Sequence, residues 1–120
     1  MNKTETYKKA LTWLHNNIVD DGGGVVVFNT KRVLYPEVTG YFIPSLINAG
    51  ENNLAISFAK KLCKIQKDDG SWYDPDGKYP FIFDTGQILK GLIAVREVLP
   101  EVNSHIIHGI EWIFSNMNEE

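Results

Sequence analysis

Three features are scarce in this sequence: cysteine, clustered positive charge and long apolar runs. Its 120 residues include one cysteine, Cys63, which cannot form an internal disulfide and fits a reducing, cytoplasmic location. No apolar run approaches the roughly 20 residues that span a membrane, and the polar start of the chain lacks a signal-peptide pattern. We therefore expect no membrane association.

Basic residues are outnumbered by acidic ones, 12 against 15, and they are dispersed along the chain. Two adjacent pairs, Lys8-Lys9 and Lys60-Lys61, fall inside helical patterns. Nucleic-acid binding through phosphates needs a denser positive patch. We therefore expect no nucleic-acid partner.

Patterns that hold a metal or a cofactor are missing as well. Cys63 has no evident Asp or His co-ligand, and its helical position favours a packed thiol. His105 and His108 share a helix face, but a third ligand is lacking. Asp74 and Asp76 belong to an Asp-Pro-Asp-Gly run, which is more typical of a turn than of a calcium loop. We expect no metal and no cofactor.

Helical periodicity is what the sequence has in abundance. Apolar residues recur at spacings of three and four near residues 4–18, 36–49, 52–66, 84–99 and 103–116. A β-branched run near residues 25–28 can pair with residues 32–35 as a minor β-hairpin in the first loop. The pattern predicts an all-α fold of about five helices.

Two pairs of polar residues predict side-chain caps at helix starts. Asn2 with Glu5, and Asp84 with Gln87, have the spacing of a capping box. We therefore expect the Asp84 carboxylate to accept a hydrogen bond from the backbone two or three residues later.

An internal repeat organises the chain. Matching positions lie 46 to 48 residues apart, at Leu14 and Leu62, Asp21 and Asp69, and Thr39-Gly40 and Thr85-Gly86. We expect one domain, residues 1–120, with helix-hairpin repeats at about 4–50 and 52–99 and a lone helix at about 103–116. Each hairpin has an apolar face that only a neighbour can bury, so the repeats must stack.

Gln66, Gly70 and Trp72 have the spacing of the QW motif, which recurs in the α/α toroids of triterpene cyclases, a fold that protein prenyltransferases share. Segments 35–44 and 83–92 resemble those of toroid proteins described as prenyltransferase-like or squalene-cyclase-like, which tend to accompany polysaccharide biosynthesis. The resemblance covers roughly residues 5 to 115 and implies a partial α/α toroid. It also implies that Gln66 caps a helix end and that Trp72 is buried between the third and fourth helices.

In such a toroid the second helix of each hairpin lines a cavity, and the N-terminal ends of these helices open on one rim. The resemblance therefore implies a rim that carries Glu37 and Asp84, the candidate catalytic pair for acid and base roles. Side chains that can contact a sugar there are Tyr41, Trp72, Tyr73, Tyr79 and Gln87. Helix capping and turn packing also explain several of these residues, so the sequence does not establish an enzyme.

Three classes of function stay open. The first is a helical-repeat interaction or binding module without catalysis of its own. The second is carbohydrate binding or processing in a cavity that oligomerisation completes. The third, terpene or prenyl chemistry, is disfavoured because the Asp-rich motif of class II terpene cyclases and a zinc site are missing.

The repeat also predicts self-association. The last helix begins a third hairpin that has no second helix, and its apolar residues cover more than one face: Ile106, Ile107, Ile110, Ile113 and Phe114. The first helix likewise lacks a preceding hairpin. Because exposed apolar ends of a repeat stack usually form interfaces, we expect a homodimer or a higher homo-oligomer.

Overall fold

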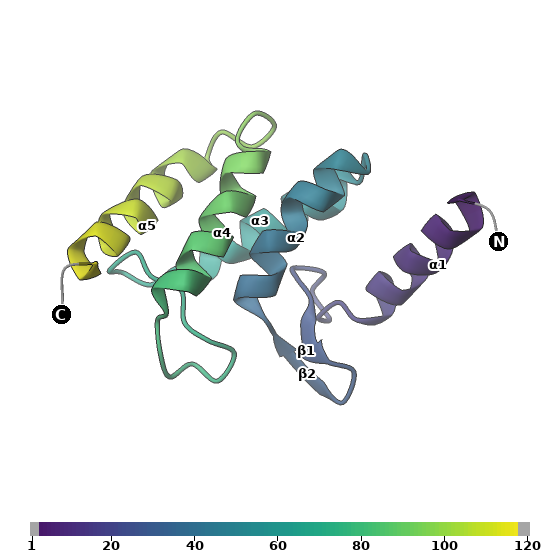
Figure 1. Cartoon of the computed structure of the whole chain (residues 1–120), viewed down its shortest axis with the longest axis horizontal. Coiled ribbons are helices and arrows are strands. Elements are labelled where there is room, and N and C mark those ends of the chain that lie inside the picture. Colours follow the sequence, from purple (N-terminus) through teal and green to yellow (C-terminus); the bar gives the residue numbers. More distant parts are fainter. Residues whose placement is uncertain (1–2, 118–120) are drawn as a thin grey trace.

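The computed structural model describes residues 3–117, which form five helices and one β-hairpin (Figure 1). In chain order the elements are α1 (Lys3–Asn16), β1 (Val26–Phe28), β2 (Lys31–Leu34), α2 (Pro36–Asn48), α3 (Asn52–Ile65), α4 (Ile82–Val95) and α5 (Val102–Asn116). The predicted all-α fold with a minor hairpin in the first loop is confirmed. The capping box predicted for Asn2 and Glu5 cannot be placed, because Asn2 lies outside the described residues.

The loops that follow α1 and α3 have the same local structure. The N–H of Gly23 donates to the Asp21 carboxylate at 2.9 Å, and the N–H of Ser71 donates to the Asp69 carboxylate at 2.9 Å. In each loop the glycine after the aspartate has a positive φ, 76° in the first and 98° in the second. Other residues are strained in this conformation, so the repeated Asp-Gly pair fixes a repeated turn.

The starts of α2 and α4 are tied to the preceding loops in the same way. The Thr39 hydroxyl oxygen accepts a hydrogen bond from the N–H of Val25 at 3.1 Å, and the Thr85 hydroxyl oxygen accepts one from the N–H of Trp72 at 3.4 Å. Both threonines are fully buried. The two helices are therefore structural counterparts, and we call α2 and α4 the inner helices.

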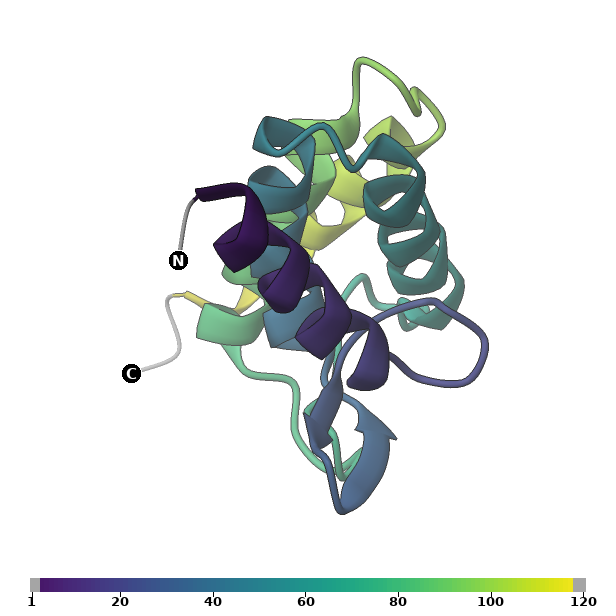
Figure 2. The ribbon, with the colours of Figure 1, turned by 90° about the vertical axis from the view of Figure 1, so that its right-hand side faces the viewer.

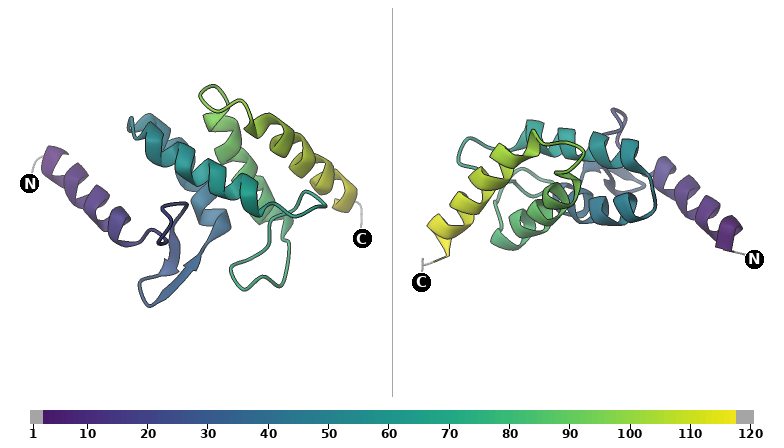
Figure 3. Two further views of the ribbon diagram at one scale, coloured as in Figure 1. Left: turned by 180° about the vertical axis from the view of Figure 1, so that it is seen from behind. Right: turned by 90° about the horizontal axis from the view of Figure 1, so that it is seen from above.

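The inner helices lie side by side, with α3 packed against both and α5 packed chiefly against α4 (Figures 1 and 3). They approach closely because a glycine stands at the crossing: a Cβ on Gly91 would lie 2.1 Å from the carbonyl oxygen of Gly40. Pro44 stands inside α2 and has no N–H, so this carbonyl lacks its usual helical donor. Fully buried apolar side chains around the crossing include Ile43, Phe58, Leu62, Ile88, Leu92 and Val95.

The chain is elongated, with α1 at one end and α5 at the other (Figure 1). Viewed from the α1 end, the β-hairpin extends beside the loop between α3 and α4 (Figure 2). The two are joined by an ion pair in which the Lys31 ammonium lies 3.0 Å from the Asp76 carboxylate. Between residues 3 and 117, no helix has the length and apolar character needed to cross a bilayer.

The cap predicted at the start of α4 is wrong. The helix begins at Ile82, and the residue before it, Phe81, makes no side-chain capping bond. Asp84 is therefore the third residue of the helix, where its charge can interact with the helix dipole but its side chain is not the N-cap. Capping consequently does not account for Asp84.

Candidate functional site

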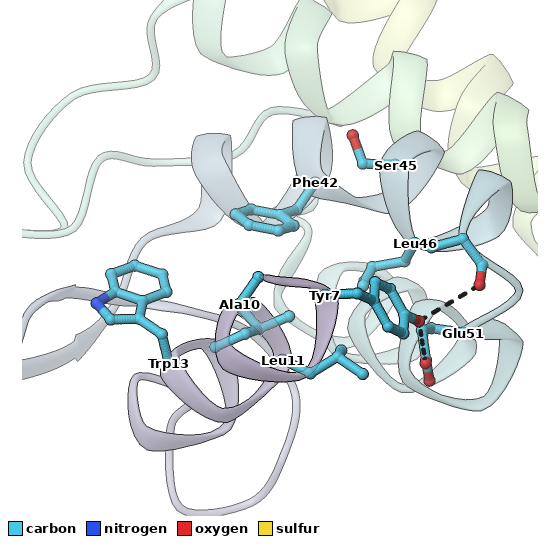
Figure 4. Close-up of a pocket in the computed structure, with 10 residues that line it drawn as sticks. Tyr7, Ala10, Leu11, Trp13, Phe42, Ser45, Leu46 and Glu51 are labelled. Carbon is cyan, nitrogen blue, oxygen red and sulfur yellow. Dashed lines mark hydrogen bonds between the residues drawn. The ribbon is translucent and has the colours of Figure 1, made fainter. Parts of the chain in front are cut away.

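An apolar groove runs between α1 and α2 (Figure 4). One cavity of the groove has a volume of about 480 Å³, and an adjoining cavity of about 630 Å³ shares Trp13 and Phe42 with it. We call this the α1–α2 groove; its walls are Tyr7, Ala10, Leu11 and Leu14 of α1 and Phe42, Ser45, Leu46 and Ala49 of α2. Figure 4 shows Trp13 at one end of the groove and Tyr7 with Glu51 at the other.

Helix α1 is held mainly near its two ends. At the start, the Tyr7 hydroxyl donates to the Glu51 carboxylate, and this hydrogen bond is the main cause of a raised pKa for Tyr7. At the finish, the Arg32 guanidinium donates to two backbone carbonyls at 3.0 and 2.9 Å. Leu14 is the one buried residue of α1. The groove side of α1 is therefore largely uncovered.

The α1–α2 groove is the counterpart of a slot that is filled one repeat later. Helix α2 packs against both α3 and α4. The counterparts of the α1 wall, 48 residues later, are Ala55, Phe58, Ala59 and Leu62, all fully buried. The counterparts of the α2 wall, 46 residues later, are Ile88, Gly91, Leu92 and Val95, which are buried too. Corresponding walls thus enclose a helix in one repeat and face open space in the other.

The crossing residues follow the same correspondence. In the filled slot, a Cβ on Gly40 would lie 2.5 Å from the Cα of Ile88, so only glycine fits there. The counterpart of Gly40 on α4 is Gly86, and a Cβ added there would meet nothing within 4 Å. Helix α4 thus carries Gly86 at the position where Gly40 allows α2 to fit its slot. Within residues 3–117, no neighbouring helix covers Gly86.

The predicted carboxylate pair lies in the first turns of the two inner helices. Glu37 of α2 and Asp84 of α4 are both partly buried. Burial, and then the charge of Asp84, raises the pKa of Glu37; burial, and then the charge of Asp74, raises the pKa of Asp84. Burial, and then the charges of Glu37 and Asp84, also raises the pKa of Tyr35. Because the two carboxyl groups interact, the rim is a candidate acid–base site.

Trp72 is fully buried, and its indole N–H donates to the carbonyl of Leu62 at 2.7 Å. Its backbone bonds to Thr85 at the start of α4, and its ring reaches Gly109 of α5, where an added Cβ would lie 3.1 Å away. The predicted burial between α3 and α4 is confirmed. The sugar-contacting role suggested for Trp72 is wrong, because the ring has no exposed face.

The other predicted contact residues are distributed over three elements. The Tyr73 ring lies under the Lys67 ammonium, 5.2 Å from its centroid. Tyr41 on α2 and Tyr79 in the loop before α4 are 47% and 60% exposed, and Gln87 on α4 is partly buried. Tyr41 and Tyr79 are thus the aromatic candidates whose rings are most available to a ligand.

Gln66 and Cys63 have structural surroundings. Gln66 follows α3 as its C-cap and donates to the carbonyls of Gly70 and His105, both at 3.0 Å, as the QW spacing implied. Burial, and then the charge of Glu101, raises the pKa of Cys63 to about 11, which keeps the thiol protonated and unreactive. Within residues 3–117, no group of three metal-ligating side chains comes together.

Comparison of the chain with protein-family models, with curated proteins and with solved structures found no match.

The α1–α2 groove is the feature that sequence reasoning missed. Trp13 and Trp112 occupy matching repeat positions, 99 residues apart, and this match predicts core contacts for both. Trp112 is 8% exposed, whereas Trp13 is 61% exposed at the groove edge, so the expectation for Trp13 is wrong. The signal was present in the repeat, since small and apolar residues of α1 align with the fully buried face of α3.

Proposed function

We propose that this chain is an interaction module that binds an amphipathic helix in the α1–α2 groove. The match between the groove and the slot that α2 fills carries the proposal, because corresponding wall positions already enclose a helix in the second repeat. A bound amphipathic helix presents apolar side chains at spacings of three and four, and the α1 wall has Tyr7, Leu11 and Leu14 to face them.

The exposed apolar surface of the groove supports the same function. Tyr7 is 40% exposed and Trp13 is 61% exposed, although both lie beside an apolar cavity. Burying such surface contributes about 25 cal/mol per Å². A helix that covers the groove would therefore gain most of its affinity from these two side chains and from Phe42.

A fluorescence titration tests the proposal. The probe is a synthetic peptide of residues 81–96 with two added lysines for solubility, which has the α4 sequence without α5 and contains no tryptophan. Emission from Trp13 should shift to shorter wavelength as the peptide covers the ring, whereas the fully buried Trp72 should not respond. A saturable shift is the expected result.

Two variants of α1 give a matched comparison. Leu11→Lys places a charge in the groove wall and should weaken binding at least tenfold, a change of about 1.4 kcal/mol. Thr12→Lys adds the same charge to an exposed position of the same helix outside the groove and should leave binding unchanged. Equal effects of the two variants, or no saturable shift with this peptide or with one of residues 36–49, would contradict the proposal.

A second candidate function, carbohydrate binding at the rim, is favoured by the interaction of Glu37 with Asp84. Partly buried carboxylates can bond sugar hydroxyls, and the exposed ring of Tyr41 can stack on a sugar face. A thermal-shift screen with neutral sugars and uronic acids tests this function. A stabilising sugar should lose its effect in Glu37→Gln with Asp84→Asn, and the absence of any stabilising sugar counts against the candidate.

A further inference from the structure

The two inner helices share a sequence pattern, and in α2 this pattern belongs to a helix that fills the slot between α3 and α4. The inference drawn from it rests on the proposed function. Each has a glycine followed by apolar residues three and seven positions later. These are Gly40, Ile43 and Ile47 in α2, and Gly86, Leu89 and Ile93 in α4. In α2, Ile43 is 0% exposed and Ile47 is partly buried against the core, because this face of α2 lies in its slot.

The crossing point of the α1–α2 groove sets a further requirement. Ser45 stands where the filled slot has Gly91, whose position faces the Gly40 carbonyl oxygen. A serine there keeps the incoming helix slightly farther away, and its hydroxyl can donate to the carbonyl of the crossing residue. A large side chain at that residue would collide with Phe42 and Ser45, which both line the groove.

The far end of a second copy meets only part of this requirement. Its α4 has the uncovered Gly86, but α5 packs against α4 as α3 packs against α2. Because α1 and α3 are repeat counterparts, an α4 placed in the groove would bring its own α5 onto the position of α1. The groove therefore excludes an inner helix that a packed helix follows.

We infer that the occupant of the α1–α2 groove is a lone amphipathic helix of a partner protein, with glycine at the crossing and apolar residues three and seven positions later. The crossing carbonyl accepts a hydrogen bond from Ser45. The partner helix would pack against α1 and α2 in the way that α2 packs against α3 and α4. It would therefore occupy the position of an inner helix one repeat before α2.

Variants of the same peptide test the glycine. Gly86→Leu in the peptide of residues 81–96 should weaken binding at least tenfold, because the crossing no longer closes. Gly91→Ala is the matched control, since Gly91 lies on the opposite face of an inner helix from Gly86 and alanine favours helix formation. This second peptide should bind as well as the parent or better. Ser45→Ala in the protein should weaken the parent peptide about threefold to tenfold.

Sedimentation of the full chain tests the exclusion of a second copy. Whatever its state of association, Leu11→Lys should leave that state unchanged, whereas loss of association in this variant would make a second copy the occupant and overturn the inference. A Gly86→Leu peptide that binds as well as the parent, and is still blocked by Leu11→Lys, would refute the glycine requirement while the groove still binds helices. Failure of every peptide would instead refute the proposed function.

Discussion

The slot between α3 and α4 and the groove between α1 and α2 are built alike and differ in what they enclose. The first holds α2 against the fully buried Ala55 and Phe58; the second leaves their counterparts, Tyr7 and Ala10, exposed. The repeat thus sets the shape of the walls, but the neighbouring helix decides whether they are buried. Equivalent positions in a repeat need not have equivalent energetic roles.

Truncating the buried Trp72 and the exposed Trp13 should give the largest difference in the free energy of unfolding. Trp72→Ala removes a fully buried ring and should lower the free energy of unfolding by about 3–5 kcal/mol. Trp13→Ala removes an exposed ring and should change it by less than about 0.5 kcal/mol. Urea unfolding followed by far-ultraviolet circular dichroism measures both. A cost below about 1 kcal/mol for Trp72→Ala would contradict its packing role.

Two glycines of α4 should respond to alanine with opposite signs. Gly91→Ala places a Cβ 2.1 Å from the Gly40 carbonyl oxygen and should destabilise the chain by about 1–3 kcal/mol. Gly86→Ala adds a Cβ in open space within a helix and should stabilise it by about 0.5–1 kcal/mol. Thermal melts of the two variants compare them directly. Destabilisation by Gly86→Ala would mean that this surface is already covered.

The other end of the chain carries the prediction of self-association. On α5, Ile107 is 58% exposed and Phe114 is 66% exposed, so an apolar surface is left for a second copy. Sedimentation equilibrium should detect a species heavier than the 13.6 kDa chain, and Ile107→Lys with Phe114→Lys should reduce it to that mass. A wild-type chain that stays monomeric at micromolar concentration would refute the prediction.

The smallest expected effect concerns the rim, which carries Glu37 and Asp84 in the first turns of α2 and α4. Because folding raises the pKa of Asp84, the charged form is disfavoured in the folded chain, and stability falls as the pH rises through that pKa. Asp84→Asn should therefore stabilise the chain at neutral pH, by no more than about 1 kcal/mol. Below about pH 3 the gain should vanish, since the wild-type carboxyl is then protonated in both states. Urea unfolding at the two pH values measures the difference.

Much of the architecture could be predicted because residues close together in the sequence mark the repeated turns and helix starts. The matching Asp-Gly and Thr-Gly pairs predict the repeat, and the spacing from Gln66 to Trp72 predicts a buried indole. The start of α4 could not be placed in the same way. Asp84 and Gln87 have capping-box spacing, yet α4 begins at Ile82, so Asp84 lies in the first turn and not at the N-cap.

The candidate site was harder to predict, because a groove depends on a neighbour and not on its own residues alone. Leu11 and Leu62 both suit a core, and only the arrangement of helices leaves Leu11 partly uncovered. The rim carboxylates could be singled out from their residue type and helix position. The effect of Asp84 on the pKa of Glu37 depends on the packing of α2 beside α4, which the sequence does not state.

The attachment of α1 near its ends has a consequence for how the molecule opens. With Leu14 as its one buried residue, α1 should detach without unfolding α2, α3 and α4, so its amide hydrogens should exchange with solvent long before those of α3. A helix bound in the groove would pack against α1. Helix α1 could then detach only when the bound helix dissociates or the other helices unfold. Slowed exchange along α1 would then report occupancy of the groove, residue by residue, without any label on the partner.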